Sequence, residues 1–294
     1  MEATTPTALE MGVEQRIKAA DFTAEMVLSD FNQRIQVLSY EARDPGAMVE
    51  KLAAEARRRG HGKLFLKAPE FDREALENAG MVREATISGY FCGEQADVMA
   101  LYLDEDRKSR PYESEQAAIL ESITSRPADA SIPDLPFGYW MATAGPSDAE
   151  ELATLYATVF ASYPFPITDP AYLISTMKTH VVYRIVRDGE GSLVAAASAE
   201  SCRRYRNAEM TDFATLPSQR GFGLAQHLLA ALEDDMLEAS IPNLYTIARA
   251  RSAGMNRVFY NRGYVMTGTL VNNCHIAGRF EDMHAWCWNR GDAQ

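Results

Sequence analysis

Features that bind phosphate groups meet in one short run, Arg220-Gly221-Phe222-Gly223-Leu224-Ala225. An apolar, strand-forming segment at 210–216 precedes this run, and a helical pattern of leucines follows it. The first turn of a helix leaves backbone N–H groups unpaired and carries a partial positive charge. Glycines at 221 and 223 let that backbone approach a ligand closely, because they have no Cβ. The run therefore predicts a pyrophosphate-binding turn at the start of a helix.

Two common nucleotide-binding motifs do not fit this turn. A phosphate loop has Lys-Ser or Lys-Thr after its last glycine, whereas Leu224-Ala225 follows here. The dinucleotide fingerprint has a third glycine at the position of Gln226. An ordinary strand-to-helix turn with two permissive glycines is the alternative interpretation of these residues alone.

The elements around the turn resemble those of a known family. The pattern R-x-x-G-x-A after an apolar strand resembles the acyl-CoA signature of the GCN5-related N-acetyltransferases. Residues 137–290 predict a strand, two helices, three strands, a helix, a strand, a helix and two closing strands. This order is similar to that of the acetyltransferase fold, with the turn after the fourth strand. The resemblance implies an α/β (α+β) acyl-CoA N-acyltransferase domain at 137–290 that uses acetyl-CoA.

The N-terminal half predicts a smaller α/β domain at residues 21–130, after a flexible lead-in at residues 1–20. A proline-rich stretch at 126–136 marks the domain boundary. The order strand, helix, glycine, long strand at 63–91 repeats at 244–273, which indicates a truncated copy of the same fold; convergent packing is the alternative. No glycine turn like that at 221–225 occurs here, so we expect no CoA site. The predicted strands are 34–40, 63–67 and 82–91, and the predicted helices are 47–59, 71–78, 94–103 and 114–123.

Transfer of an acetyl group to an amine requires a base, because an ammonium group has no lone pair. Glu209 and Asp212 precede the turn on its strand, and Glu200 lies on the strand before. Strand alternation puts Glu209 and Asp212 on opposite faces unless a bulge intervenes, so we expect only one to face the cleft. Either one is a candidate catalytic base or ammonium anchor, and a solvated strand residue is the alternative for each.

The family resemblance also assigns residues to the cofactor. In the family the pantetheine arm pairs with the exposed edge of the fourth strand, which corresponds here to Phe213 and Thr215. Many members use a helix tyrosine to protonate the leaving thiolate, but Phe259 stands at that position and Tyr260 points about 100° away on the helix. Ser252 replaces an asparagine that is often found near CoA, so a non-catalytic acyl-CoA-binding module is an alternative function. The implied cofactor-binding residues are Phe213, Thr215, Arg220, Gly221, Phe222, Gly223, Leu224, Ala225, Ser252 and Phe259.

A closer resemblance, to the β-lysine N-acetyltransferases, covers nearly the whole chain. Segments 247–259, 268–273 and 276–283 carry it, together with 88–93 in the first half. It implies acetylation of the side-chain amine of β-lysine to give Nε-acetyl-β-lysine, a compatible solute; a protein or peptide amine is the alternative acceptor. Such an acceptor needs cations for its carboxylate and carboxylates for its amines. The candidates are Arg249, Arg251, Arg279, Asn272, Asn273, Glu281, Asp282 and Glu209, and a structural role is the alternative for each.

The composition favours a soluble protein of the cytoplasm. The chain has 29 Lys and Arg against 41 Asp and Glu, and the net charge of −12 disfavours nucleic acid and anionic membranes as partners. Its 4 cysteines form no C-x-x-C pair, so we expect neither a metal site nor a disulfide framework. The N-terminus lacks the pattern of a secretory signal, and no apolar run is long enough to span a membrane. The expected partner is a small amine, and a homodimer is the expected form of any assembly.

Overall fold

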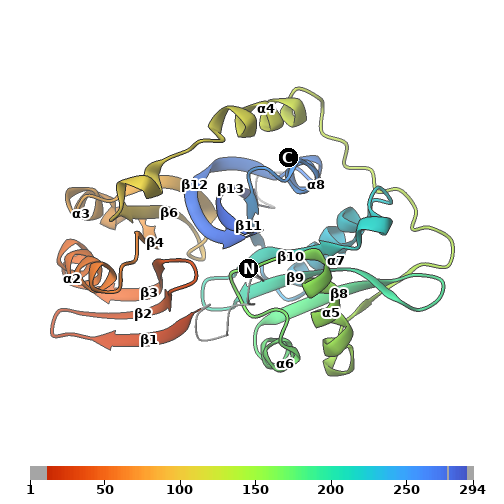
Figure 1. Ribbon diagram of the computed structural model, residues 1–294, viewed down its shortest axis with the longest axis horizontal. Helices are drawn as coiled ribbons and strands as arrows, with labels where there is room; N and C mark the ends of the chain where they lie inside the picture. The colour runs from red at the N-terminus through yellow and green to blue at the C-terminus, as the bar shows by residue number, and fades with distance from the viewer. Residues whose placement is uncertain (1–11, 277, 290–294) are drawn as a thin grey trace, which may run out of the picture.

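The structure, a computed structural model, describes residues 12–276 and 278–289. Within these residues the strands form a 6-stranded sheet from the N-terminal half and a 7-stranded sheet from the C-terminal half. Figure 1 shows the two sheets side by side, with helix α4 and the segment after it bridging them along one edge of the molecule. Both halves are therefore parts of one structure.

The N-terminal sheet has the strand order β1-β2-β3-β4-β6-β5. Helix α2 begins at Pro45, where the Asp44 side chain accepts a hydrogen bond from the Ala47 backbone N–H. Its apolar face, including Met48 and Leu52, is buried against the sheet. The elements are β1 (Val13–Lys18), β2 (Phe22–Ser29), β3 (Arg34–Ala42), α2 (Pro45–Arg58), β4 (Lys63–Pro69), η1 (Glu70–Asp72), α3 (Arg73–Asn78), β5 (Val82–Gly89) and β6 (Gly93–Tyr102).

Two predictions for this half are wrong. The segment 94–103 is not a helix but strand β6, which lies between β4 and β5 and is buried on both faces from Ala96 to Ala100. Its tertiary position overrides the local preference, and burial on both faces removes the alternation that marks a strand. The flexible lead-in predicted for 1–20 is contradicted at Val13–Lys18, which pairs with β2 along its whole length. This edge strand is mostly exposed and polar, so it carries no apolar signal; residues 1–11 lie outside the described part of the chain.

The C-terminal half has the element order predicted from the sequence, in a sheet ordered β12-β13-β11-β10-β9-β8-β7. Helices α7 and α8 cover one face, and α5 and α6 cover part of the other. The linking elements are η2 (Glu105–Lys108) and α4 (Glu113–Thr124). The half comprises β7 (Trp140–Thr143), η3 (Pro146–Asp148), α5 (Ala149–Val159), α6 (Pro170–Met177), β8 (Val181–Arg187), β9 (Leu193–Cys202), β10 (Asn207–Thr215), η4 (Pro217–Gln219), α7 (Leu224–Glu238), β11 (Asn243–Arg249), α8 (Ala253–Asn261), β12 (Val265–Ile276) and β13 (Arg279–Asn289).

The two halves share one connectivity. Strands β1, β2 and β3 form an antiparallel meander like that of β8, β9 and β10. In each half a helix then leads to a parallel strand, and the last two strands return antiparallel in the same spatial order. The N-terminal half has no counterpart of β7, α5 and α6 among the described residues. This agrees with the truncated copy predicted from the sequence.

A shared core joins the halves. Apolar side chains of β4, β5 and β6 pack against those of β11, β12 and β13. Gly268 of β12 lies so close to β5 that a Cβ there would meet the Glu84 carbonyl oxygen at 2.2 Å. Arg34 donates to the carbonyl of Asn273, and Arg107 donates to the carbonyl of Asn272. The face of the second sheet opposite α7 and α8 is therefore shared between α5, α6 and the N-terminal half.

Candidate active site

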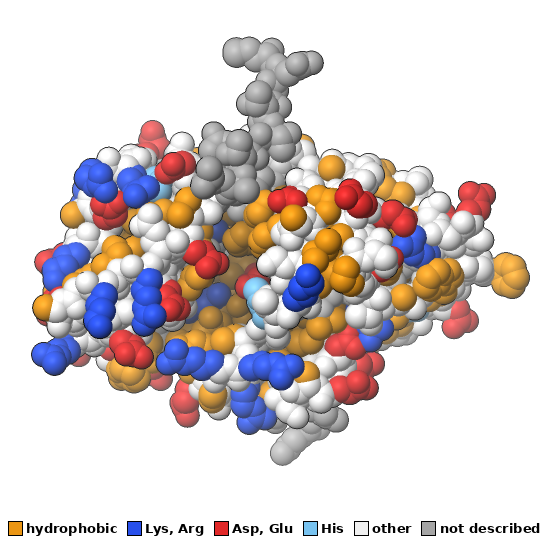
Figure 2. Space-filling model, turned by 90° about the horizontal axis from the view of Figure 1, so that it is seen from below, with side chains coloured by type: hydrophobic (Ala, Val, Ile, Leu, Met, Phe, Trp, Pro, Cys, Tyr) orange, Lys and Arg blue, Asp and Glu red, His pale blue; other side chains and the backbone are white. Residues whose placement is uncertain are grey.

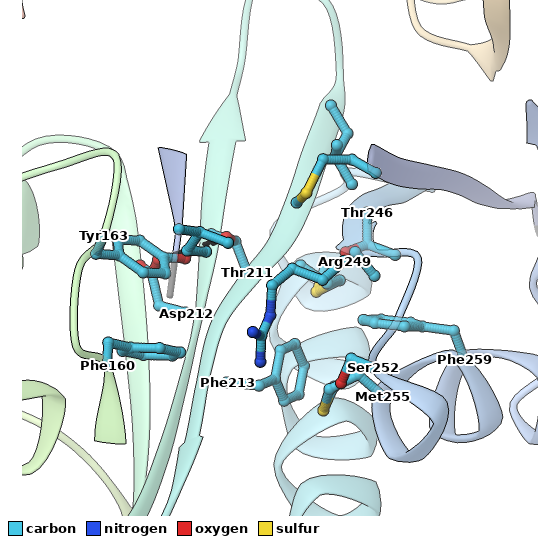
Figure 3. Close-up of a pocket in the computed structure, with 15 residues that line it drawn as sticks. Phe160, Tyr163, Thr211, Asp212, Phe213, Thr246, Arg249, Ser252, Met255 and Phe259 are labelled. Carbon is cyan, nitrogen blue, oxygen red and sulfur yellow. Dashed lines mark hydrogen bonds between the residues drawn. The ribbon is translucent and has the colours of Figure 1, made fainter. Parts of the chain in front are cut away.

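Strands β10 and β11 run in parallel for a short distance and then part. Their pairing covers only Asn207–Glu209 against Asn243–Tyr245. Beyond it a pocket lies between the strands, lined by residues from 210–213 on one side and 246–249 on the other. Figure 3 shows this gap, with the start of α8 at its side. The unpaired backbone edges on both sides can accept an extended ligand.

A bulge in β10 brings Asp212 to this pocket. The register with β9 shifts between Thr211 and Ala214, and Asp212 has a φ of 55°. Its carboxylate accepts hydrogen bonds from the Tyr163 hydroxyl at 2.7 Å and from the Ser198 hydroxyl at 2.6 Å. Burial raises the pKa of Asp212, although these donors act in the opposite direction. The side chain is thus a fixed, desolvated carboxylate at the parting of the strands (Figure 3).

Glu209 lies on the same face of the sheet as Asp212. Glu209 pairs with Glu200 of β9, and Ser198 lies on the same face of β9 as Glu200 because the two are two residues apart. The Ser198 hydroxyl donates to Asp212, so Asp212 lies on this face too. The bulge that the sequence prediction allowed for is present, and it turns Asp212 onto the face of Glu209. Burial raises the pKa of Glu209 to about 7. Glu209 does not line the pocket between the strands, so Asp212 is the better placed of the two candidate bases.

The predicted phosphate-binding turn has the expected geometry. Gly221 and Gly223 have φ values of 92° and 72°, and α7 starts at Leu224. Within the described chain, the backbone N–H groups of residues 221–225 donate no hydrogen bond. Arg220 and Phe222 are exposed beside them, whereas Leu224 is buried and anchors the helix. The turn therefore presents free donors at a helix start, which suits an anion.

The other predicted cofactor residues are divided between the pocket and its surroundings. Phe213, Ser252 and Phe259 line the pocket, and the rings of Phe213 and Phe259 lie 5.5 Å apart. Thr215 pairs with Ala195 of β9 and does not line the pocket. Tyr260 points away, as predicted, and its hydroxyl donates to the carbonyl of Arg126 at 3.0 Å. Helix α8 thus presents no acidic hydroxyl from either position 259 or 260.

Of the predicted substrate-binding residues, only Arg249 lines the pocket. Its side chain reaches toward Phe213 across the gap (Figure 3), and it has no ion pair within the described chain. Arg251 instead bonds Glu115 of α4 at 3.0 Å and stacks on Tyr112 at 4.3 Å. Arg251 is therefore engaged with α4 and the residue before it, and it does not line the pocket.

Two of the remaining substrate candidates join the two halves, and the third pairs within its own strand. The Asn272 side chain donates to the carbonyls of Arg107 and Ser109. Asn273 is buried, and its carbonyl accepts from Arg34. Glu281 is buried in an ion pair with Arg279 at 2.8 Å. None of the three lines the pocket, and the side chains of Asn272 and Glu281 are engaged elsewhere, whereas the buried Asn273 side-chain oxygen has no hydrogen-bond partner among the described residues.

Sequence reasoning missed Tyr163, Ser198 and Lys67. Tyr163 lies in the loop after α5, and only the bulge at Asp212 brings it near. Lys67 belongs to β4 of the N-terminal half, and its ammonium group donates to the Tyr245 hydroxyl at 3.1 Å. Figure 2 shows a hollow between the two halves, with acidic and basic side chains inside it. A local sequence signal for these contacts does not exist, since each one joins segments far apart in the chain.

Two further properties concern the described residues only. None of the helices found there is long and apolar enough to cross a membrane. No group of three or more His, Cys, Asp or Glu side chains there is arranged to hold a metal ion.

Comparison with known proteins identifies close relatives. Residues 149–264 match the family model described as Acetyltransferase (GNAT) family. N-acetyltransferase YodP of Bacillus subtilis is 37% identical over 271 residues, which is 92% of this chain and 98% of that protein. Beta-lysine N(6)-acetyltransferase of Methanococcus maripaludis is 34% identical over 88% of this chain and 93% of its own length. The protein of the same name from Methanosarcina mazei is 33% identical over 77% of this chain and 90% of its own length.

Solved structures also align with part of the chain. Spermidine N-acetyltransferase SpeG of Vibrio cholerae aligns over 53% of this chain and 96% of its own, with a TM-score of 0.45 and 16% identity. The acetyltransferase yncA of Salmonella typhimurium, solved with acetyl-CoA, aligns over 52% of this chain and 94% of its own, with a TM-score of 0.44 and 16% identity.

Proposed function

The chain belongs to the GCN5-related N-acetyltransferase family and is an N-acetyltransferase, and on this premise we propose that it acetylates the side-chain amine of β-lysine with acetyl-CoA. The relatives named beta-lysine N(6)-acetyltransferase support this acceptor. The product would be Nε-acetyl-β-lysine, a solute with one positive charge fewer than β-lysine. We place the reaction in the cytoplasm.

The residues at the parted strands fit acetyl-CoA. The free N–H groups of residues 221–225 suit its pyrophosphate, and the unpaired edges of β10 and β11 suit its extended arm. Phe213, Phe259 and Met255 give the pocket an apolar wall. Acetyl-CoA, when bound, supplies an acetyl group activated as a thioester. Arg249 is the cation placed to meet the arm or a phosphate, rather than the acceptor's carboxylate.

Asp212 is the group that we assign to the proton of the acceptor's ammonium. Its buried carboxylate has a raised pKa, so it is a stronger base than an exposed aspartate. Tyr163 and Ser198 hold it in one orientation, which keeps its position defined relative to the pocket. Its place in the bulge, at the point where β10 leaves β11, is the observation that carries this assignment.

Release of free thiol from acetyl-CoA tests the proposal. The protein is mixed with acetyl-CoA and a panel of amines, namely β-lysine, lysine, ornithine and an N-terminal peptide. We expect turnover with β-lysine well above that with the peptide, and a product acetylated on the side-chain amine by mass spectrometry. Binding of CoA in calorimetry without turnover of any amine would instead support the non-catalytic module. Preferred turnover of the peptide would replace the small amino acid with a protein acceptor.

A further inference from the structure

We propose that the N-terminal half completes the acceptor site, with Lys67 binding the carboxylate of the amino-acid substrate beside Glu209 and Glu200, which bind its ammonium group. This inference rests on the proposed function and names the group that selects amino acids over simple diamines. It gives the otherwise unassigned half of the chain a role in substrate recognition.

Lys67 is a cation without a carboxylate in contact. Its ammonium group lies 5.2 Å from the Tyr90 ring centre and 5.1 Å from that of Tyr245, and it donates to the Tyr245 hydroxyl. Within the described residues no Asp or Glu lies at ion-pair distance from it. Lys63, four residues earlier on the same strand, contacts Glu84 at 2.8 Å. A largely enclosed ammonium that lacks such a partner is suited to an anionic ligand.

Lys67 remains charged in this setting. Burial lowers its pKa, but the nearby Tyr90 hydroxyl, Glu209 and Glu200 more than offset this effect, and its pKa lies above the ordinary value. Two aromatic faces also favour a cation at this position. The group is thus a positive charge held between two rings, close enough to the glutamates for their charges to act on it.

The glutamates supply the opposite charge. Glu209 and Glu200 face each other across β10 and β9, and each is influenced by the charge of Lys67. Burial raises the pKa of Glu209, whereas Glu200 is exposed and also lies 3.8 Å from the His180 ring nitrogen. A zwitterionic head group would give Lys67 a carboxylate and the glutamates an ammonium, and so satisfy both sides at once. A diamine would bring only cations and would leave Lys67 unpaired.

The distance to Asp212 suits a diamino acid. Asp212 follows Glu209 by three residues on the same strand and face, which is about 10 Å along a regular strand and less with a bulge. A head group held at Lys67 and Glu209 would therefore leave the far amine of a lysine-like chain near Asp212. The two carboxylates take different tasks, head-group binding and proton removal.

The test compares β-lysine with cadaverine, a diamine of similar length that has no carboxylate. We expect the parent enzyme to favour β-lysine by at least about 100-fold in kcat/KM, on the scale of one buried charge pair. Lys67→Met should reduce that preference at least tenfold by raising KM for β-lysine, with cadaverine little affected. Lys67→Arg, which keeps the charge, should retain part of the preference. Lys51→Met is the control, since Lys51 packs on Phe22 and pairs with Asp21 on the surface.

Calorimetry separates this inference from the proposed function. β-Lysine is titrated into the protein with CoA present, and CoA is titrated alone. We expect Lys67→Met to weaken β-lysine binding at least tenfold and to leave CoA binding unchanged. Failure of the parent to acetylate any amine would refute the proposed function, whereas β-lysine binding would still test Lys67. Equal losses for β-lysine and cadaverine in both Lys67 variants, or an unchanged preference, would overturn the inference.

Discussion

Asp212 and Glu209 are neighbours on one strand, yet their surroundings assign them different chemistry. Asp212 is fixed by two hydroxyl donors and lines the pocket between the strands. Glu209 lies beside a second carboxylate and a lysine, outside that pocket. In enzymes, two acidic groups in different environments commonly take different roles, such as binding the substrate and transferring a proton.

Asp212→Asn should lower kcat by a factor of about 10² to 10⁴, the usual contribution of a general base. An amide keeps the shape and can still bond Ser198, so CoA affinity measured by calorimetry should not change. Glu209→Gln serves as the matched comparison and should raise KM for the amine more than it lowers kcat. A loss below tenfold in kcat for Asp212→Asn would remove Asp212 from the role of base.

Glu209→Gln should also stabilise the protein in a pH-dependent way. The pKa of Glu209 is raised to about 7 in the folded state, from an ordinary 4.5. Below pH 4.5 both states are protonated, so the substitution should change little. Between pH 4.5 and 7 the unfolded state ionises first, so the parent loses stability as the pH rises. The variant should therefore gain up to about 3 kcal/mol by pH 8, from about 1.4 kcal/mol per pKa unit.

Urea unfolding at pH 5 and pH 8 measures this gain. Glu190→Gln, in the exposed turn between β8 and β9, is the control and should show the same stability difference at both pH values. If Glu209→Gln also changed the unfolding free energy equally at both pH values, Glu209 would ionise in the folded protein as it does in water.

At this scale the sequence predicts residue types better than their contacts. Glu209 and Asp212 are identifiable because they precede the glycine turn on its strand. The bulge that turns Asp212 over cannot be identified from the sequence, because no local pattern predicts a φ of 55° at this aspartate. Arg251 and Asn272 have suitable chemistry, but their side chains are engaged by α4 and by the segment before it. Glu281 pairs with Arg279 of its own strand, and Asn273 is contacted through its backbone carbonyl by Arg34.

At the scale of elements, the turn before α7 connects β10, which borders the gap to β11, with the start of the helix. The segment at 127–136 runs beside this turn, and a Cβ on Gly223 would meet Pro133 at 2.8 Å. Gly221 has open space around it, and its positive φ is its only restriction. The two glycines are thus required for different reasons, one for backbone conformation and one also for packing.

Gly221→Ala and Gly223→Ala should both weaken CoA binding at least tenfold, because a positive φ disfavours alanine and moves the donor N–H groups. Gly223→Ala should have the larger effect and should also lower the melting temperature, since Pro133 must move. Gly191→Ala, at a φ of 86° in a hairpin far along the chain, has the same strain and no nearby atoms. Calorimetry with CoA should show no change for this control; an equal loss there would mean that strain alone explains the effect.

Elements with a clear period were predictable, and those without one were not. The helices and strands of the C-terminal half follow the predicted order, because α5 and α7 are amphipathic and β8 and β9 form a hairpin. The sequence of strand β6 predicts a helix, because burial on both faces hides the alternation of a strand. Strand β1 was missed because its exposed residues are mostly polar.

At the scale of the whole molecule, two copies of one connectivity carry different residues at corresponding places. The start of α2 carries Asp44, a carboxylate at the position where α7 offers free N–H groups. That charge would repel a phosphate, and the absence of a CoA site from this half stays a prediction. The half instead places Lys67 against the second sheet, and the contacts of Lys63 and Arg34 fix how the halves meet.

Lys63 tests whether the halves form one folding unit. It is buried and contacts the Glu84 carboxylate at 2.8 Å and the Val271 carbonyl of the other half at 2.8 Å. Glu84 also accepts from the Tyr102 hydroxyl and from the Val271 N–H. Lys63→Met leaves that carboxylate buried and uncompensated, which should cost about 3–5 kcal/mol of unfolding free energy.

Adding Glu84→Gln to Lys63→Met should restore part of this loss, because the amide carries no charge and its oxygen can still accept from Tyr102 and Val271. Lys51→Met, which breaks an exposed pair with Asp21, should change stability by less than about 1 kcal/mol. Urea unfolding followed by tryptophan fluorescence and by circular dichroism should give coincident transitions in every variant, since the shared core spans both halves. Separate transitions in the Lys63 variant, with the C-terminal half unfolding at its parental urea concentration, would show that this half folds without the N-terminal half.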